Sequence, residues 1–254
     1  MKSHTEFVNL AYNNADMTIT VVYDNNACKE GLETGWGFSV VISGCEKTIL
    51  FDTGGDGAIL LGNMGKLGID VNGIDLVVLS HIHGDHTGGL DGFLGKNSKV
   101  SVYLPESFAK KFKDGVAKYG VEVVEVKEPV EICKDVHSVG QLGTLIKEQS
   151  LVIRTDKGLV VITGCAHPGI VKIVKAAKEL LEEEVFLVMG GFHLEWSTRG
   201  KIKRIISAFK DLGVSYVGPC HCSGDKARGM FEKHFGENYI GVGAGRAIAS
   251  TDLQ

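Results

Sequence analysis

Four side chains that can bind metal ions fall within six positions, directly after an apolar segment at residues 74–79. They are His81, His83, Asp85 and His86. Residues two apart in an extended or tightly turned segment point to the same side, so His81 and His83 can bind one ion. Asp85 and His86 lie on the following turn and can reach a second ion beside it. Imidazole and carboxylate donors suit zinc, iron or manganese, and this nitrogen-rich mixture favours zinc.

Two metal ions need more than four protein ligands, and three further histidines also end apolar segments. They are His167, His193 and His221. In open α/β sheets, ligands collect beyond the carboxyl ends of the strands, so we expect these side chains to approach the first four. A pocket-lining or substrate-binding role suits His193 as well as metal ligation. Asp52 ends another apolar segment, and we expect it to orient a ligand histidine without contacting metal.

The elements that must position these side chains follow from the hydrophobic periodicity. We expect strands at residues 17–23, 37–43, 47–52, 74–79, 99–104, 121–126, 151–155, 158–163, 185–189 and 214–217. We expect helices at residues 58–67, at 168–181, at 201–212, from Pro105 through position 116, and from a capping Ser223 to position 234. Strands grouped first and βαβ-like units later predict a mixed α/β fold with two sheets packed face to face and helices outside.

Length and composition are those of a globular enzyme. The chain has 254 residues, 44% of them apolar and 23% charged, with a net charge of −4. We expect one domain over residues 1–254, no nucleic-acid partner because no basic excess exists, and no membrane partner because no apolar run is long enough to span one. The N-terminus has no apolar core of signal-peptide length, so the predicted location is the cytoplasm. The six cysteines are then expected to be reduced thiols.

These segments resemble a known family. HIHGDH at residues 81–86 and FDTG at residues 51–54 are similar to the H-x-H-x-D-H and D-T-G motifs of the metallo-β-lactamase fold superfamily. The resemblance covers nearly the whole chain and implies a four-layer αβ/βα sandwich of two mixed sheets with outer helices. The segments GCAHPGI, GGFHL and PCHCSG resemble the branch of dihydropterin-ribofuranosylaminobenzene phosphate synthase-like proteins, which is linked to methanopterin biosynthesis.

The resemblance also implies a set of metal ligands. His81, His83 and a third histidine would bind one ion, and Asp85, His86 and a last histidine the other. We assign His167 as the third histidine and His221 as the last. The superfamily usually has a bridging aspartate where this sequence has Cys165, so Cys165 either replaces it as a thiolate ligand or leaves the bridge to water. Cys220 and Cys222 flank His221, and without a second C-x-x-C pair we expect buried free thiols rather than a structural zinc site.

Three functional hypotheses follow. The first is a metal-dependent hydrolase that uses two divalent ions, zinc before iron or manganese, and Asp85 as the catalytic carboxylate on an ester, thioester, lactone or phosphodiester. The second is a synthase that condenses a pterin with an aryl phosphate. The third is a non-hydrolytic sensor or redox protein. We expect a small substrate, anionic in some of these cases, with Trp36 and Trp196 as candidate pocket residues, and a homo-oligomer is compatible with the sequence.

Overall fold

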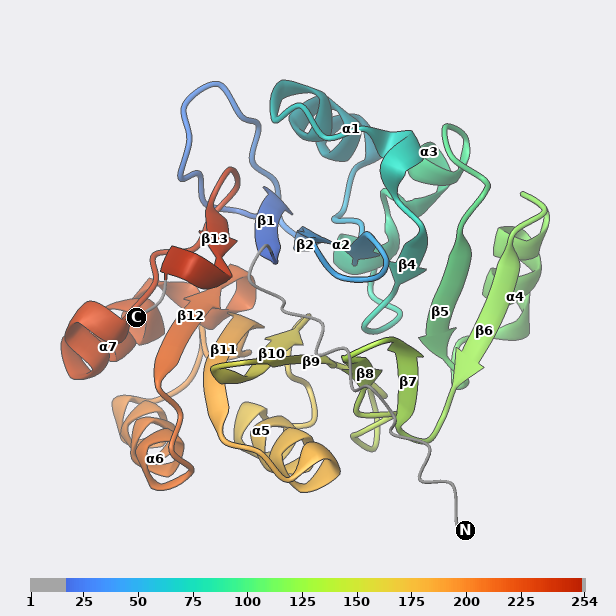
Figure 1. The fold of residues 1–254 in the computed structure, drawn as a ribbon. Helices are drawn as coiled ribbons and strands as arrows, with labels where there is room; N and C mark the ends of the chain where they lie inside the picture. Colours follow the sequence, from blue (N-terminus) through green and yellow to red (C-terminus); the bar gives the residue numbers. More distant parts are fainter. Residues whose placement is uncertain (1–16, 253–254) are drawn as a thin grey trace, which may run out of the picture.

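Two mixed β-sheets pack against each other in the computed structural model, which describes residues 17–252 (Figure 1). The N-terminal segment discussed above lies outside the described residues. The first sheet has the order β13-β1-β2-β3-β4-β5-β6. Its strands are β1 (Thr18–Tyr23), β2 (Ser39–Ser43), β3 (Ile49–Phe51), β4 (Leu76–Val78), β5 (Ser101–Pro105), β6 (Glu122–Val126) and β13 (Ala247–Ala249). The strands from β3 to β6 are parallel, and the other pairs are antiparallel.

The second sheet has the order β12-β11-β10-β9-β8-β7. Its strands are β7 (Val130–Cys133), β8 (Val136–Ser138), β9 (Leu151–Thr155), β10 (Gly158–Thr163), β11 (Val185–Gly191) and β12 (Tyr216–Cys220). β10, β11 and β12 are parallel, and β9 and β10 form an antiparallel hairpin. Parallel strands need crossover connections, and helices provide them here.

Helices cover the outer face of each sheet (Figure 1). The covering helices are α1 (Gly57–Lys66), α3 (Leu90–Leu94), α4 (Lys110–Ala117), α5 (Ile170–Leu181), α6 (Arg199–Asp211) and α7 (Gly224–Phe235), and the short α2 (Gly84–Thr87) follows β4. Asp56 starts α1 by accepting hydrogen bonds from the N–H groups of Ala58 and Ile59. Thr198 caps α6 in the same way, with Lys201 N–H as the donor. None of the helices in the described part of the chain combines the length and apolar character needed to cross a bilayer.

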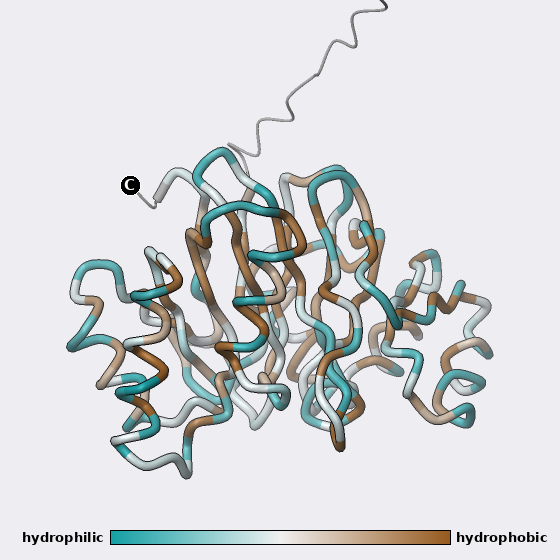
Figure 2. The backbone as a smooth tube through the Cα atoms, turned by 90° about the horizontal axis from the view of Figure 1, so that it is seen from below, coloured by the Kyte–Doolittle hydropathy of each residue, from teal (hydrophilic) through white to brown (hydrophobic). Residues whose placement is uncertain are grey.

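Three apolar clusters separate the layers. One lies between the sheets and includes Phe51 and Ile162; the second packs α5, α6 and α7 on the second sheet, and the third packs α1, α3 and α4 on the first. Figure 2 shows hydrophobic residues concentrated along the central strands and hydrophilic residues on the outer loops. This arrangement is the predicted four-layer αβ/βα sandwich of two mixed sheets with outer helices.

Some boundaries differ from those expected. Pro105 ends β5, where it pairs with Val126 of β6, so α4 begins only at Lys110. Strand pairing to the end of β6 therefore overrides the helix-starting tendency of Pro105. Ser223 precedes α7 but makes no capping bond, because its hydroxyl accepts the N–H of Phe192 at 3.0 Å. The short strands β7 and β8 were not expected, because their runs are too brief for a clear period.

Candidate metal centre

The candidate site lies where loops from both sheets meet. Asp52 directly follows β3, and His81 to His86 follow β4 in the first sheet. In the second sheet, Cys165 and His167 follow β10, His193 follows β11 and His221 follows β12. The residues after these strands meet because the strands in each sheet run parallel and end at the same edge.

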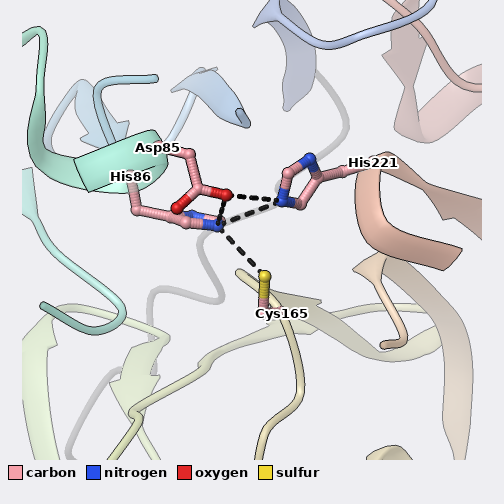
Figure 3. A group of neighbouring side chains, drawn as sticks. All are labelled: Asp85, His86, Cys165 and His221. Carbon is pink, nitrogen blue, oxygen red and sulfur yellow. Dashed lines mark hydrogen bonds and ion pairs between the residues drawn. The ribbon is translucent and has the colours of Figure 1, made fainter. Parts of the chain in front are cut away.

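One group of four donors is formed by Asp85, His86, Cys165 and His221 (Figure 3). His86 Nε2 lies 3.2 Å from Cys165 Sγ and 3.3 Å from His221 Nε2. Asp85 Oδ2 lies 3.3 Å from His221 Nε2 and 3.7 Å from His86 Nε2. Three of these side chains are buried and Asp85 is partly exposed. Four convergent nitrogen, oxygen and sulfur donors match the ligand number of a tetrahedral zinc site.

A second group lies beside the first and shares Cys165 with it. Its members are His81, Cys165 and His167, whose donor atoms lie within 4.8 Å of one another. His83 joins them, since its Nδ1 lies 3.1 Å from His81 Nε2 and its ring centroid is 4.8 Å from that of His167. The two groups are therefore adjacent, and the Cys165 sulfur atom is a donor common to both.

Cys165, His193 and Cys222 form a third group, again with donor atoms within 4.8 Å of one another. The Sγ atoms of Cys165 and Cys222 are 3.3 Å apart. The hydrogen bond with Cys165, followed by one with His193, holds the pKa of the Cys222 thiol well below its usual range. Cys222 is therefore next to the candidate centre, whereas Cys220 is buried in the core between the sheets.

Asp52 orients side chains of the segment that follows β4. Its Oδ2 accepts hydrogen bonds from the Ser80 hydroxyl and from His86 Nδ1, each at 2.7 Å. With its Nδ1 proton on Asp52, His86 presents Nε2 to the donor group. The Ser80 hydroxyl is also 2.9 Å from His81 Nδ1, which directs His81 Nε2 toward the site. Asp52 thus has the position that the predicted orienting role requires.

His221 has its own supporting pair at the end of β1. Asn25 Oδ1 lies 2.9 Å from His221 Nδ1, and the fully buried Asp24 accepts the His221 N–H at 3.1 Å. The Asn25 contact places the imidazole proton on Nδ1 and leaves Nε2 facing Asp85 and His86. Neither residue was singled out from the sequence, although both end an apolar strand as the ligand histidines do.

Glu148 holds the loop after β10 in place. It is 1% exposed, and its two carboxyl oxygens accept the N–H groups of Cys165, Ala166 and His167 at 2.8–2.9 Å. Burial raises the pKa of Glu148, and these three N–H groups act in the opposite direction. Glu148 stands in a loop with no distinctive spacing, so no sequence signal pointed to it.

The His81 and His167 imidazoles and the Asp85 carboxylate are biased toward their metal-binding forms, whereas at His86 the effect of the Asp52 carboxylate outweighs that of burial and raises the pKa. Burial, and then the neighbouring imidazoles, lower the pKa of His81 far below its usual value and that of His167 to about 4. Burial acts to raise the pKa of Asp85, but the hydrogen bond with His221 and the charge of His86 outweigh it and bring the pKa to about 2. At neutral pH His81 and His167 are therefore neutral imidazoles and Asp85 is an ionised carboxylate.

Several site residues have left-handed backbone conformations. Asp52, Ala166, His193 and His221 have φ angles of 56°, 58°, 53° and 48°. Such angles are uncommon for residues other than glycine and are found where the surroundings impose them. Gly164 faces Ser80 and Asp52 so closely that a Cβ atom there would overlap the Ser80 side chain. The two sheets therefore approach one another closely at the site.

A cavity of about 320 Å³ adjoins the donor groups. Its lining residues are Trp36, His193, Glu195, Trp196, Ser197, Lys201 and Cys222. Trp36 also contacts the centre, because its ring centroid is 5.0 Å from that of His221. The loops that carry the two tryptophans thus line a pocket beside the metal-ligand candidates, within the 300–1,000 Å³ range of ligand sites.

The residues present fit divalent metal ions. His167 Nε2 is buried and has no hydrogen-bond partner among the residues that the structure describes. Buried nitrogen atoms are normally paired, so an ion is the partner that the neighbouring donors would support. Burial raises the pKa of the Asp24 and Glu148 carboxyl groups next to the donors, and positive charge at the centre would stabilise their ionised forms.

All nine residues predicted for the site lie in it. Seven are in the first two donor groups or in contact with them, Asp52 is behind them, and His193 is between His167 and the cavity. Cys222 was expected only as a buried thiol. It is buried, but its position between Cys165 and the cavity depends on the order of the strands and could not be read from its neighbours in sequence.

Comparisons with known proteins agree with this geometry. Residues 35–171 match the model of the metallo-beta-lactamase superfamily. The chain is 32% identical to a 7,8-dihydropterin-6-methyl-4-(beta-D-ribofuranosyl)-aminobenzene-5'-phosphate synthase from Methanocaldococcus jannaschii, over 81% of this chain and 85% of that protein.

Solved structures extend the comparison. The metal-dependent hydrolase Tm1679 of the beta-lactamase superfamily is 33% identical, with a TM-score of 0.77 over 91% of this chain and 98% of that one. The metallo-beta-lactamase fold protein YhfI from Bacillus subtilis, at 16% identity and a TM-score of 0.68 over 91% of this chain and 99% of that one, shares the fold. The chain is therefore an enzyme that belongs to the metallo-beta-lactamase superfamily.

Proposed function

We propose that this enzyme is a metal-dependent hydrolase that acts on an ester, thioester, lactone or phosphodiester of a small molecule. The observation that carries the proposal is the pair of adjacent donor groups that share Cys165. His81, His83 and His167 would hold one ion, and Asp85, His86 and His221 the other, with Cys165 between them. The mixture of imidazole, carboxylate and thiolate donors favours zinc over harder ions.

In the proposed reaction, the metal ions and the protein side chains have different roles. Bound divalent ions supply a water of near-neutral pKa and polarise the substrate oxygen. Asp85 is ionised at neutral pH and partly exposed, so it can accept a hydrogen bond from the attacking water and orient it. Asp52, Ser80 and Asn25 keep the imidazoles turned toward the reacting centre. These residues therefore fix the geometry in which hydrolysis takes place.

The cavity supports a small anionic substrate. Lys201 lines it and places a positive charge near His193. Trp36 and Trp196 are 51% and 91% exposed, so each offers an apolar ring surface to a ligand. A substrate that spans the cavity would present its reacting group to the donor groups through the side occupied by His193 and Cys222. Its negative group would then interact with Lys201.

The identity to the M. jannaschii synthase supports a second candidate. In that case the same side chains would position a pterin and an aryl phosphate for condensation without net hydrolysis. The two candidates differ in their behaviour toward simple substrates, because a hydrolase of this kind cleaves activated model compounds and a dedicated synthase leaves them intact.

The test is a hydrolysis assay on the full chain, first freed of metal by chelation and then reloaded with zinc. Nitrophenyl esters, a thioester, a lactone and a bis-nitrophenyl phosphodiester serve as probes. We expect at least one to be cleaved by the zinc-loaded protein, and cleavage to disappear on chelation and in His86→Ala, which controls for contaminating hydrolases. Equal activity of the metal-free protein would refute the proposal. Intact probes together with full zinc binding would favour the synthase.

A further inference from the structure

Cys222 lies between the candidate centre and the cavity, and the proposed hydrolysis gives it no role. Its sulfur is 3.3 Å from that of Cys165, and it is also hydrogen-bonded to His193. Cys165 and Cys222 are 3% and 5% exposed, whereas the His193 side chain is exposed on the cavity side. Two sulfur atoms and an imidazole therefore converge beside the first two donor groups, with which they share only Cys165.

The backbone holds these donors in position. Leu194 and Glu195 donate their N–H groups to Cys222 O at 3.1 and 3.2 Å, which ties the loop after β11 to the loop after β12. His193 is in a left-handed conformation with a φ of 53°. Gly191 allows a close approach, since a Cβ atom there would lie 2.7 Å from Cys222 Sγ. Hydrogen bonds and backbone strain thus bring His193 and Cys222 together in advance of any ligand.

The arrangement resembles an open metal site more than a closed one. Catalytic zinc sites have three protein donors and leave the fourth position to water or substrate, whereas structural sites have four. Here three donors come from the protein, and the cavity of about 320 Å³ borders two of them, His193 and Cys222. Two sulfur donors select a thiophilic ion over magnesium or calcium.

We propose that Cys165, His193 and Cys222 form a third metal-ion position, which binds zinc or a similar thiophilic divalent ion and has its open coordination face toward the cavity. Cys165 then bridges this ion and the centre of the proposed function, on which the inference rests for that shared ligand. Binding of the ion displaces the protons of the Cys165 and Cys222 thiols into solvent, because metal ligation requires thiolates. A ligand in the cavity would reach this ion first.

The test is a cobalt titration of the full chain, made metal-free by chelation and kept reduced. Elemental analysis after dialysis gives the equivalents bound, and the thiolate-to-cobalt charge-transfer absorbance reports the sulfur ligands. We expect Cys222→Ser to bind about one equivalent less and to lose roughly half of that absorbance, because one of two thiolates is gone. His193→Ala, which alters an exposed side chain, should lose the same equivalent. Cys28→Ser, at an exposed thiol outside the donor groups, is the matched control and should behave as the wild type.

The outcomes separate this inference from the proposed function. If Cys222→Ser and His193→Ala keep the equivalents and the absorbance of the wild type, the third position is refuted and the two-ion centre is unaffected. If either variant folds but loses every equivalent, Cys222 and His193 belong to the two-ion centre and the third position is again refuted. If the wild type binds no cobalt, both proposals fail. Retention of the Cys222-dependent absorbance in His86→Ala would support separate sites.

Discussion

The two halves of the chain contribute to the proposed metal centre in different ways. The first half provides His81, His83, Asp85 and His86 from one turn after β4 and the start of α2. The second half provides Cys165, His167, His193 and His221 from the ends of three parallel strands. A contiguous segment needs only local backbone geometry to bring its donors together. A distributed set needs the sheet to be assembled in the right order.

Each half also has its own buried carboxyl group. Asp52 accepts hydrogen bonds from the Ser80 hydroxyl and the His86 ring, and also from the Ser80 backbone N–H. Glu148 accepts hydrogen bonds mainly from backbone N–H groups, those of residues 165–167, and from one side chain, the Thr163 hydroxyl. In the first half, the buried carboxyl group thus orients the imidazole ring of a candidate ligand. In the second half, it mainly holds the main chain of the loop that carries the candidate ligands. Ligand orientation and loop position are therefore separate requirements of one centre.

Removal of one ligand from each half gives the largest expected effect. His86→Ala and His221→Ala should each reduce metal-dependent turnover by more than the roughly 10–100-fold typical of residues that only orient a ligand. Both imidazoles belong to the same donor group, so the losses should be similar. Steady-state kinetics of zinc-loaded proteins, with circular dichroism to verify folding, measures them. A folded His221→Ala enzyme with near-normal turnover would show that the distributed half is dispensable.

Replacement of Asp52 and Glu148 by their amides should have smaller effects, on zinc affinity in the first case and on the free energy of unfolding in the second. Asp52→Asn is expected to weaken zinc binding about 10–100-fold, because His86 loses its charged acceptor. Glu148→Gln is expected to lower the free energy of unfolding by about 1–3 kcal/mol, because its amide group opposes a buried N–H donor. Competition with a chromophoric chelator and urea unfolding measure the two quantities. If Glu148→Gln changed neither, the loop after β10 would not depend on Glu148.

Stability of the metal-free protein should depend on pH over different ranges in the two halves. His167 has a folded pKa of about 4 against an ordinary 6.5, so only the unfolded chain takes up its proton as the pH falls through this range. The free energy of unfolding should therefore fall from pH 6.5 to about 4, and His81 acts in the same direction.

Asp85 acts at lower pH. Its folded pKa is about 2 against 3.8, so its stabilisation is present above pH 3.8 and is lost as the pH falls toward 2. Urea unfolding in chelator at a series of pH values measures both effects. His167→Ala should flatten the upper range and Asp85→Asn the lower one. An unchanged slope between pH 6.5 and 4 in His167→Ala would contradict the assignment.

The two cavity tryptophans should show the smallest effects. Trp36 comes from the first half and contacts His221 of the second, whereas Trp196 is 91% exposed. Trp36→Ala is expected to raise KM about 2–10-fold, the size of a ring-stacking interaction of about 0.5–1.5 kcal/mol. Trp196→Ala should raise it less, and its stability should stay within about 0.5 kcal/mol of the wild type. A larger KM effect at Trp196 would place the substrate at the outer rim of the cavity.

Sequence patterns were sufficient to predict the fold class and to identify the four neighbouring donor residues of the first half. The spacing of His81, His83, Asp85 and His86 depends only on neighbours along the chain, and apolar segments of four to seven residues located most strands. The histidines of the second half were found because each follows such a segment. Asp24 and Asn25 follow β1 in the same manner and could have been found by the same rule.

The remaining contacts depend on tertiary structure. Glu148 acts on N–H groups about 17 residues away, across a turn whose course no local pattern determines. Cys165 and Cys222 become neighbours only because β10, β11 and β12 lie side by side. The late start of α4 has the same origin, since pairing of Pro105 with Val126 is a contact between strands. Long-range pairing thus limited the prediction more than residue chemistry did.

The close approach of Gly164 to Ser80 has a consequence for protein engineering. A loop carrying HIHGDH that is transplanted onto another scaffold would bring four donors but not Gly164, which leaves room for Ser80 at the start of that loop. Any recipient with a side chain at that point would push the graft outward and separate its histidines from their partners. A successful transplant must therefore reproduce the close contact between the two sheets at Gly164, together with the loop.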